Sequence, residues 1–192
     1  MAYNIIKPPF TLDFYEMPKK ELKEYFRWFQ EVIPDRINGL ARTVKESPGF
    51  ENWQPDYTPI SLISLGEWMS TQVQTRERSE EELEQKRQEI GHAAHPVEIP
   101  KWELTNQTFS LAMDIGMYLS QVFLRNHPSL KWDQLFSSKR DMDYGQPVLV
   151  GFGRAPFNPV QMTVTQAYAL VHKTRSGKGL RELYDIWSRK IH

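Results

Sequence analysis

Apolar side chains recur at helical spacing between residues 18 and 44. Intervals of three and four residues place them on one side of a helix, so the pattern predicts an amphipathic helix. Pro34 interrupts the pattern and is expected to kink the helix or to end it. The apolar positions are Leu22, Tyr25, Phe26, Phe29, Ile33, Ile37, Leu40, Ala41 and Val44.

The segment ahead of this helix, residues 1–17, is predicted to be an extended arm. Pro8-Pro9 disfavours a helix there and favours extended backbone. Residues 18–192 are then expected to form a single domain. Residues 47–59 contain three prolines and predict a loop, after which helical spacing indicates a second helix from about Ile60 to Val73.

Charged residues dominate the stretch from Arg76 to Glu89. Leu83 is its one strongly apolar residue, so the stretch is interpreted as a solvated helix held by local ion pairs such as Glu82 with Lys86. The alternative is an acidic recognition surface. Residues 91–100 contain a glycine and two prolines, which is typical of a connector.

The most apolar helix is predicted between about Glu103 and Arg125. Its apolar side chains cover almost the whole circumference, which is typical of a buried helix. Two short strands, Lys131–Phe136 and Pro147–Phe152, are predicted after it. Together these elements predict a mostly helical α+β fold with a small antiparallel sheet.

Two helices are predicted after the sheet. Asn158 is a favourable N-cap, and Pro159 occupies the favoured first helical position. A strand over Val160–Val164 competes with this helix, because apolar residues also alternate there. Gly177 separates it from a last helix.

A narrow polar strip crosses the predicted buried helix. Ser110, Asp114, Gln121 and Arg125 fall on one line when the helix is laid out at 3.6 residues per turn. A buried carboxylate requires a partner, so Asp114 is expected either to satisfy a structural neighbour or to belong to a polar site in a cleft. The candidate polar site comprises Asp114, Tyr118, Gln121 and Arg125.

Motifs for metals and cofactors are incomplete. His92 and His95 form an His-x-x-His pair and Glu89 with His92 forms Glu-x-x-His, but a zinc or di-iron site needs more ligands. Asp141 and Asp143 resemble only half of a metal-binding loop. We therefore predict no metal and no cofactor.

Two further features have simple structural interpretations. Gly151-Phe152-Gly153 lacks the third glycine of a dinucleotide loop and is interpreted as a turn in which glycine permits positive φ. His127 lies at the predicted end of the buried helix, where a protonated imidazole interacts favourably with the helix dipole.

Composition narrows the class of protein. The chain of 192 residues has 24 basic and 24 acidic residues and no cysteine, which excludes disulfides and thiolate chemistry. A net charge of zero argues against a dedicated nucleic-acid binder and does not oppose self-association. A locally basic C-terminal region is interpreted as a solvated helix. No signal peptide or membrane-spanning run is recognisable, so a cytoplasmic protein is expected.

Four segments resemble a family of uncharacterised cytoplasmic proteins from Gram-positive bacteria. The resemblance would cover about residues 55–190 and implies no activity and no catalytic residues. The segments are Ser61–Met69 (SLISLGEWM), Asp114–Leu119 (DIGMYL), His127–Trp132 (HPSLKW) and Gln146–Phe152 (QPVLVGF).

These observations favour a non-catalytic binding protein, of the kind represented by immunity proteins that neutralise toxins. Trp53, Tyr57 and Trp132 are the candidate interface anchors, because Trp and Tyr dominate binding hot spots. The competing interpretation is that all three close over the core. The alternative function is a small enzyme with a polar site around Asp114.

Overall fold

The computed structural model describes residues 3–90 and 98–191, and the described chain is mostly helical with two small antiparallel sheets. The predicted α+β class is confirmed. The helices are α1 (Lys19–Lys45), α2 (Ser61–Gln72), α3 (Glu80–Ile90), α4 (Asn106–Asn126), α5 (Pro159–Val171) and α6 (Gly179–Ser188). The strands are β1 (Thr75–Glu77), β2 (Trp102–Leu104), β3 (Lys131–Gln134) and β4 (Pro147–Val150).

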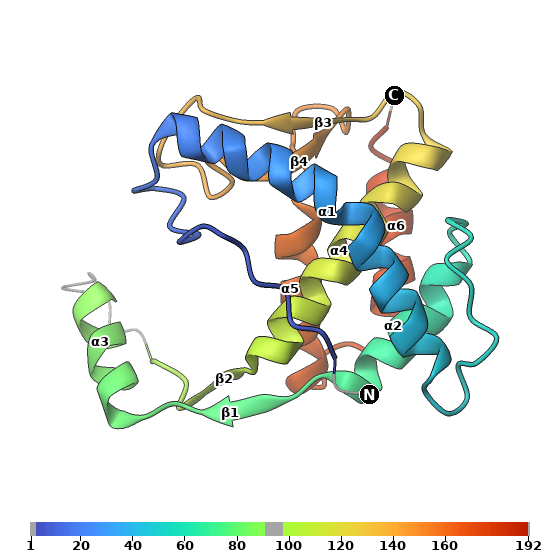
Figure 1. The fold of residues 1–192 in the computed structure, drawn as a ribbon, viewed down its shortest axis with the longest axis horizontal. Coiled ribbons are helices and arrows are strands. Elements are labelled where there is room, and N and C mark those ends of the chain that lie inside the picture. Colours follow the sequence, from blue (N-terminus) through green and yellow to red (C-terminus); the bar gives the residue numbers. More distant parts are fainter. Residues whose placement is uncertain (1–2, 91–97, 192) are drawn as a thin grey trace.

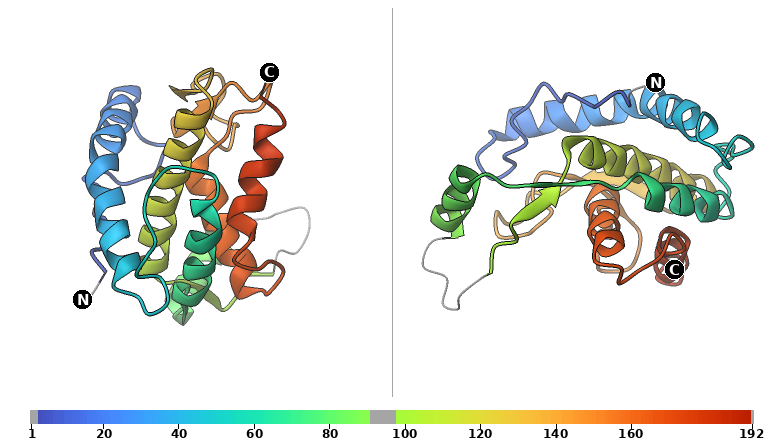
Figure 2. Two further views of the ribbon diagram at one scale, coloured as in Figure 1. Left: turned by 90° about the vertical axis from the view of Figure 1, so that its right-hand side faces the viewer. Right: turned by 90° about the horizontal axis from the view of Figure 1, so that it is seen from below.

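Helix α4 is the centre of the packed body. It lies between α1 on one side and α5 on the other, and α2 packs on α6 (Figures 1 and 2). Gly116 allows α5 to approach closely, because a Cβ at this position would lie 2.9 Å from the carbonyl oxygen of Pro159. Thr163 of α5 also donates a 2.7 Å hydrogen bond to the carbonyl oxygen of Ala112. An α4 helix enclosed on both sides explains why its sequence is apolar nearly all round.

Helix α1 is continuous through Pro34. The predicted end of the helix at this residue is not observed, and the helix bends about halfway along its length instead (Figure 1). Pro34 lies on the exposed side, where the missing backbone N–H costs no buried hydrogen bond. The bend keeps the apolar stripe of α1 turned toward the body of the protein.

The predicted antiparallel sheet is present as β3 and β4. Lys131 pairs with Val150 and Gln134 with Pro147, and both strands are shorter than predicted. A further antiparallel bridge joins Leu149 to Phe157 just before α5. The competing strand at Val160–Val164 is wrong: these residues belong to α5, whose first turn is capped by Asn158 accepting a 3.0 Å hydrogen bond from the N–H of Gln161.

The β1–β2 ribbon was not predicted. Residues 103 and 104, predicted to begin the buried helix, instead pair with Arg76 and Thr75 in an antiparallel ladder. Helix α4 begins later because the side chain of Thr105 caps it, accepting a hydrogen bond from the N–H of Thr108. The predicted helix over Arg76–Glu89 is likewise too long at its start, since β1 occupies residues 75–77.

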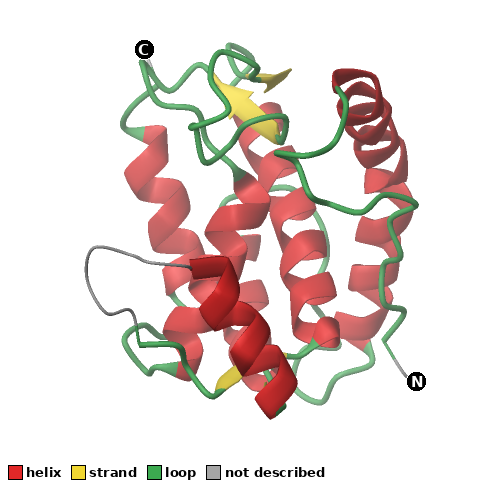
Figure 3. Cartoon of the chain, turned by 90° about the vertical axis from the view of Figure 1, so that its left-hand side faces the viewer, coloured by secondary structure: helices red, strands yellow, loops and turns green. Residues whose placement is uncertain are grey.

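Helix α3 stands off one side of the body at the end of this ribbon (Figures 1 and 2), and it lies in front of the body in the view of Figure 3. Ser79 and Glu82 form a reciprocal capping box at its start: each side chain accepts a hydrogen bond from the backbone N–H of the other. Leu83 is the one buried side chain among the described residues of α3, and it lies outside the main hydrophobic core. None of the described helices is long and apolar enough to cross a membrane.

Candidate functional site: a buried carboxylate beneath the N-terminal arm

Asp114 forms a buried ion pair with Arg36. Arg36 projects from α1 toward α4, and its Nε and Nη2 donate hydrogen bonds of 2.8 and 2.7 Å to the two carboxylate oxygens of Asp114. This two-pronged geometry is the strongest form of carboxylate recognition by arginine. The hydroxyl of Tyr3 donates a further, short hydrogen bond to the same carboxylate. Asp114 is 1% exposed, so the carboxylate has almost no contact with bulk solvent.

The same cluster fastens the N-terminal arm to the body. Nη2 of Arg36 also donates a 2.8 Å hydrogen bond to the carbonyl oxygen of Asn4. The backbone N–H of Ile6 donates a 2.8 Å hydrogen bond to the hydroxyl of Ser110 on α4. Half of the predicted polar strip, Ser110 and Asp114, therefore meets the arm and α1.

The surroundings of Asp114 affect its titration in opposing ways. Burial raises the pKa of Asp114, while the hydrogen bonds from Arg36 and Tyr3 act to lower it. Burial next to Asp114 also raises the pKa of Tyr3 well above its ordinary value, so this phenol stays protonated and acts as a donor. The cluster is thus built to hold one carboxylate in place rather than to exchange protons.

Tyr118 lies in a separate cluster further along α4. Its hydroxyl lies 2.7 Å from the hydroxyl of Ser61 and accepts a 3.1 Å hydrogen bond from the backbone N–H of Tyr57. The ring of Trp53 packs edge-on against it with centroids 5.4 Å apart. Burial raises the pKa of Tyr118 to about 12. A phenol with this pKa is poorly matched to proton transfer near neutral pH.

The far end of the polar strip holds the 47–59 loop in place. The guanidinium of Arg125 stacks on the ring of Tyr57 at 3.4 Å from the ring centre. Asn126 donates a 2.8 Å hydrogen bond to the carbonyl oxygen of Tyr57, whose φ is positive at 61°. Gln121 is half-buried, and its side chain makes no hydrogen bond to the described residues. The four predicted polar-site residues are therefore not brought together at one place.

The candidate interface aromatics pack inward. Trp53 is 6% exposed and its indole N–H donates a 3.0 Å hydrogen bond to the carbonyl oxygen of Ser61. Tyr57 is half-buried between Tyr118 and Arg125. Trp132 is half-buried with its ring edge against Phe29. All three residues close over the core, so the structure offers none of them as a free anchor.

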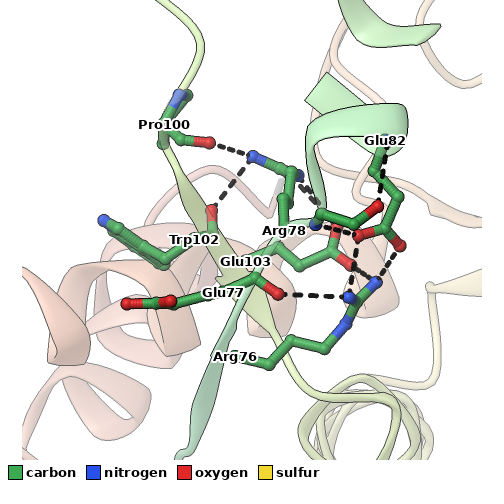
Figure 4. A network of polar contacts seen from close by, with 8 residues as sticks. Arg76, Glu77, Arg78, Glu82, Pro100, Trp102 and Glu103 are labelled. Carbon is green, nitrogen blue, oxygen red and sulfur yellow. Dashed lines mark hydrogen bonds and ion pairs between the residues drawn. The ribbon is translucent and has the colours of Figure 1, made fainter. Parts of the chain in front are cut away.

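A second polar network lies in the β1–β2 ribbon (Figure 4). Arg76 binds Glu82 through two hydrogen bonds of 3.0 and 2.6 Å and makes a further, short contact with Glu103. Arg78 lies 3.2 Å from Glu103 and also donates hydrogen bonds to the carbonyl oxygens of Pro100 and Trp102. The hydrogen bonds from Arg76 and from the N–H of Ser79 lower the pKa of Glu82 to about 2. These contacts stiffen the ribbon where α3 begins.

The described residues contain no cluster that could hold a metal ion. No group of three His, Asp or Glu side chains converges within the described residues. The side chains of Glu89, His92 and His95 lie outside that part of the chain. Gly151 and Gly153 both have positive φ, which confirms the predicted turn.

Acidic neighbours reduce the charge of the C-terminal region. Arg181 pairs with Asp185 at 2.9 Å and Arg175 with Glu182 at 3.6 Å. Both pairs lie on or beside α6, whose opposite face buries Leu180, Leu183 and Tyr184, so the helix is solvated on one side only.

The sequence interpretation missed the partners of Asp114. Arg36 lies at the edge of the apolar stripe of α1, between Ile33 and Ile37. A basic residue at the edge of one apolar helix and an acidic residue on another were the available signal. Tyr3 carried no local signal, because its contact with Asp114 spans 111 residues of chain.

Comparison of the chain with protein-family models, with curated proteins and with solved structures finds no match. The resemblance to uncharacterised Gram-positive proteins stays a prediction, and the site is interpreted from its geometry alone.

Proposed function

We propose that this chain is a non-catalytic bacterial protein that acts in the cytoplasm by binding another protein, in the manner of immunity proteins that neutralise toxins. The observation that carries the proposal is the arm formed by β1, α3 and β2. A helix held off the body on a stiffened ribbon buries little of itself, so its surface is available to a partner (Figures 1 and 4).

The arm is positioned firmly at its base. The ring of Trp102 packs against Tyr168 and His172 of α5, with centroids 5.9 and 5.1 Å apart. The Arg76 and Arg78 pairs then connect the two strands to the start of α3. A pre-positioned element loses less conformational entropy on binding than a mobile one, which favours affinity.

The charge of α3 indicates the chemistry of the partner. Glu80, Glu81 and Glu84 are exposed, and Arg87 compensates Glu84 alone through a 2.9 Å ion pair. Complementary potentials steer association and set specificity. The acidic face therefore fits a protein with a basic surface, such as a toxin that acts on nucleic acid.

The alternative of a small enzyme around Asp114 has less support. Both oxygens of that carboxylate accept hydrogen bonds, and Tyr3 covers them. Tyr118, the second polar candidate, lies in a different cluster and has a high pKa. A general base needs a free oxygen for a substrate proton, whereas both oxygens of Asp114 are already engaged by Arg36 and Tyr3 and the side chain is 1% exposed.

The test uses the products of the genes that flank this one. Each is co-expressed with the chain and tested for a complex by size-exclusion chromatography and isothermal titration calorimetry. We expect one of them to be toxic alone, to be neutralised by this chain and to bind it. Reversal of charge at Glu80, Glu81 and Glu84 to lysine should weaken binding by about tenfold or more and slow association.

A matched control carries the same change of charge on the body. Glu16, Glu24 and Glu31 are exposed and lie outside the β1–α3–β2 arm, so their replacement by lysine should leave affinity unchanged. Flanking genes that encode no binding partner would remove the immunity assignment. A complex that both triple variants weaken equally would show that net charge, and not the arm, determines binding.

A further inference from the structure

A small cavity of about 250 Å³ lies beside the Asp114 cluster, along the C-terminal half of α1. Arg36 and Asp114 form its inner wall, and Tyr3 and Asn4 of the N-terminal arm close one side. Pockets for drug-sized ligands begin at about 300 Å³, so this volume suits a molecule of amino-acid size. The cavity is separate from the β1–α3–β2 arm, so a ligand bound in it would not depend on the proposed function.

Gly39 forms the floor of the cavity. A Cβ built on Gly39 would meet nothing within 4 Å, and the residue does not have a positive φ. Neither packing nor backbone conformation therefore requires glycine there. Glycine is nevertheless among the least favourable residues in a helix interior. Its local effect is to leave the helix backbone uncovered at the base of the cavity, which permits close approach of a ligand.

Two arginines flank this floor. On a helix, residues three positions before and after Gly39 lie about 60° to either side of it, which places Arg36 and Arg42 on opposite walls. Nε and Nη2 of Arg36 are engaged by the cluster, whereas Nη1 makes no hydrogen bond to the described residues. Arg42 is exposed, and its guanidinium makes no ion pair or hydrogen bond with the described residues. Two unused guanidinium faces converge on one cavity.

Two acidic residues complete the lining. Asp35 and Glu46 are exposed carboxylates that make no ion pair with the described residues. Asp114 already neutralises Arg36. The remaining charges are one guanidinium and two carboxylates, so the cavity offers partners to a ligand that has both an anionic and a cationic group.

We propose that this cavity binds a free amino acid, with its carboxylate above Gly39 between Arg36 Nη1 and Arg42 and its ammonium group directed toward Asp35, one helical turn before Gly39. Arginine suits this role because its planar fork donates paired hydrogen bonds to a carboxylate. The Asp114 carboxylate holds Arg36 in the required orientation from behind.

The test is a thermal-shift screen of the full-length protein against the twenty free L-amino acids, with titration calorimetry of those that raise Tm. Binding to the folded state raises Tm by mass action. We expect at least one amino acid to bind, and its N-acetyl and amide derivatives to bind at least about tenfold more weakly, because each lacks one of the two charges.

Two variants and two controls make the result specific. Gly39→Ala should raise the Tm of the unliganded protein and weaken amino-acid binding by about tenfold or more, an outcome that misfolding cannot produce. Arg42→Met should also weaken binding. Asn38→Ala and Arg27→Met change exposed α1 residues that do not line the cavity, and both should bind normally. Absence of binding by all twenty amino acids, or binding unchanged in Gly39→Ala and Arg42→Met, would overturn the proposal without affecting the test of the protein-binding function.

Discussion

At the scale of single residues, Asp114 has the most exacting environment in the described chain. A carboxylate on the most buried helix is stabilised by a guanidinium from α1 and a phenol from the N-terminal arm. Replacing a buried ion pair by apolar residues is often neutral, whereas removing one partner leaves an uncompensated charge. The ion pair therefore serves mainly to specify how α1, α4 and the N-terminal arm pack against one another.

The first prediction concerns loss of one partner. Arg36→Met should lower the free energy of unfolding by about 3–5 kcal/mol, because the Asp114 carboxylate is then buried with Tyr3 as its remaining donor. Asp114→Leu should cost a similar amount through the stranded guanidinium. The double variant should be markedly more stable than the sum of the two changes predicts. Urea unfolding measures all three variants.

Arg27→Met, an exposed change on the same helix, is the control and should stay within about 0.5 kcal/mol of the unmodified protein. Hydrogen exchange at residues 3–8 gives an independent measure, since Asn4 and Ile6 lose their partners if the cluster opens. Strictly additive single changes would contradict a coupled pair.

The second prediction concerns His127, for which the sequence favoured a protonated imidazole at the end of α4. In the structure its Nε2 lies 3.0 Å from the hydroxyl of Tyr184, and burial lowers its pKa below the ordinary value. His127 in the unfolded state has the ordinary pKa of about 6.5 and therefore binds a proton more readily than in the folded state. The free energy of unfolding should therefore fall as the pH falls from about 7 to about 5.

The variant His127→Gln keeps a polar group near Tyr184 but does not titrate in this range. Its free energy of unfolding should therefore depend less on pH between about 7 and about 5 than that of the unmodified protein. Guanidinium unfolding across this interval measures the difference. A larger loss of stability on acidification in the variant would mean that the dipole interaction of a charged His127 dominates.

At the scale of elements, local pattern was sufficient for helices with one long apolar face. The stripe from Leu22 to Val44 predicted α1, and Asn158-Pro159 predicted the start of α5. The ribbon could not be predicted in this way, because strands of three residues contain too few alternations to be distinguished from a helix end. Ser79 and Glu82 form a capping box that was present in the sequence as a signal for the true start of α3.

The local sequence pattern did not predict which distant elements pack against each other. The residues of the polar strip on α4 lie on one side of the helix, yet they contact different neighbours. Ser110 and Asp114 contact the N-terminal arm and α1, while Arg125 contacts the 47–59 loop. Helical periodicity gives the direction of a side chain but not the element that faces it.

At the scale of the whole molecule, the described chain consists of a helical body and the β1–α3–β2 arm, which contributes little to the core. The Tyr168 and His172 rings hold Trp102 at the base of the β1–α3–β2 arm, whereas Leu83 of α3 does not belong to the main hydrophobic core. A segment outside the core contributes little to the cooperative unfolding of the body. The stability of the body and the function of the arm should therefore be separable.

The third prediction is that α3 and its connection to β2 can be removed from the β1–α3–β2 arm without unfolding the body. Arg78 and Lys101 face each other across the ribbon, and the N–H of Arg78 donates a 2.8 Å hydrogen bond to the carbonyl oxygen of Lys101. Replacement of residues 79–100 by Asn-Gly would close these strands as a tight hairpin. The Tm should change by no more than about 2 °C, because none of the described residues in the excised segment belongs to the main core.

Trp102→Ala in the full-length chain is the informative contrast, since it removes the aromatic contact that anchors the ribbon to α5. This change should lower Tm more than excision of the arm, by several degrees, as expected for loss of a large packed side chain. Differential scanning calorimetry measures both variants. If excision proved the more destabilising of the two, α3 would belong to the folding unit of the body, and stability and binding would not be separable.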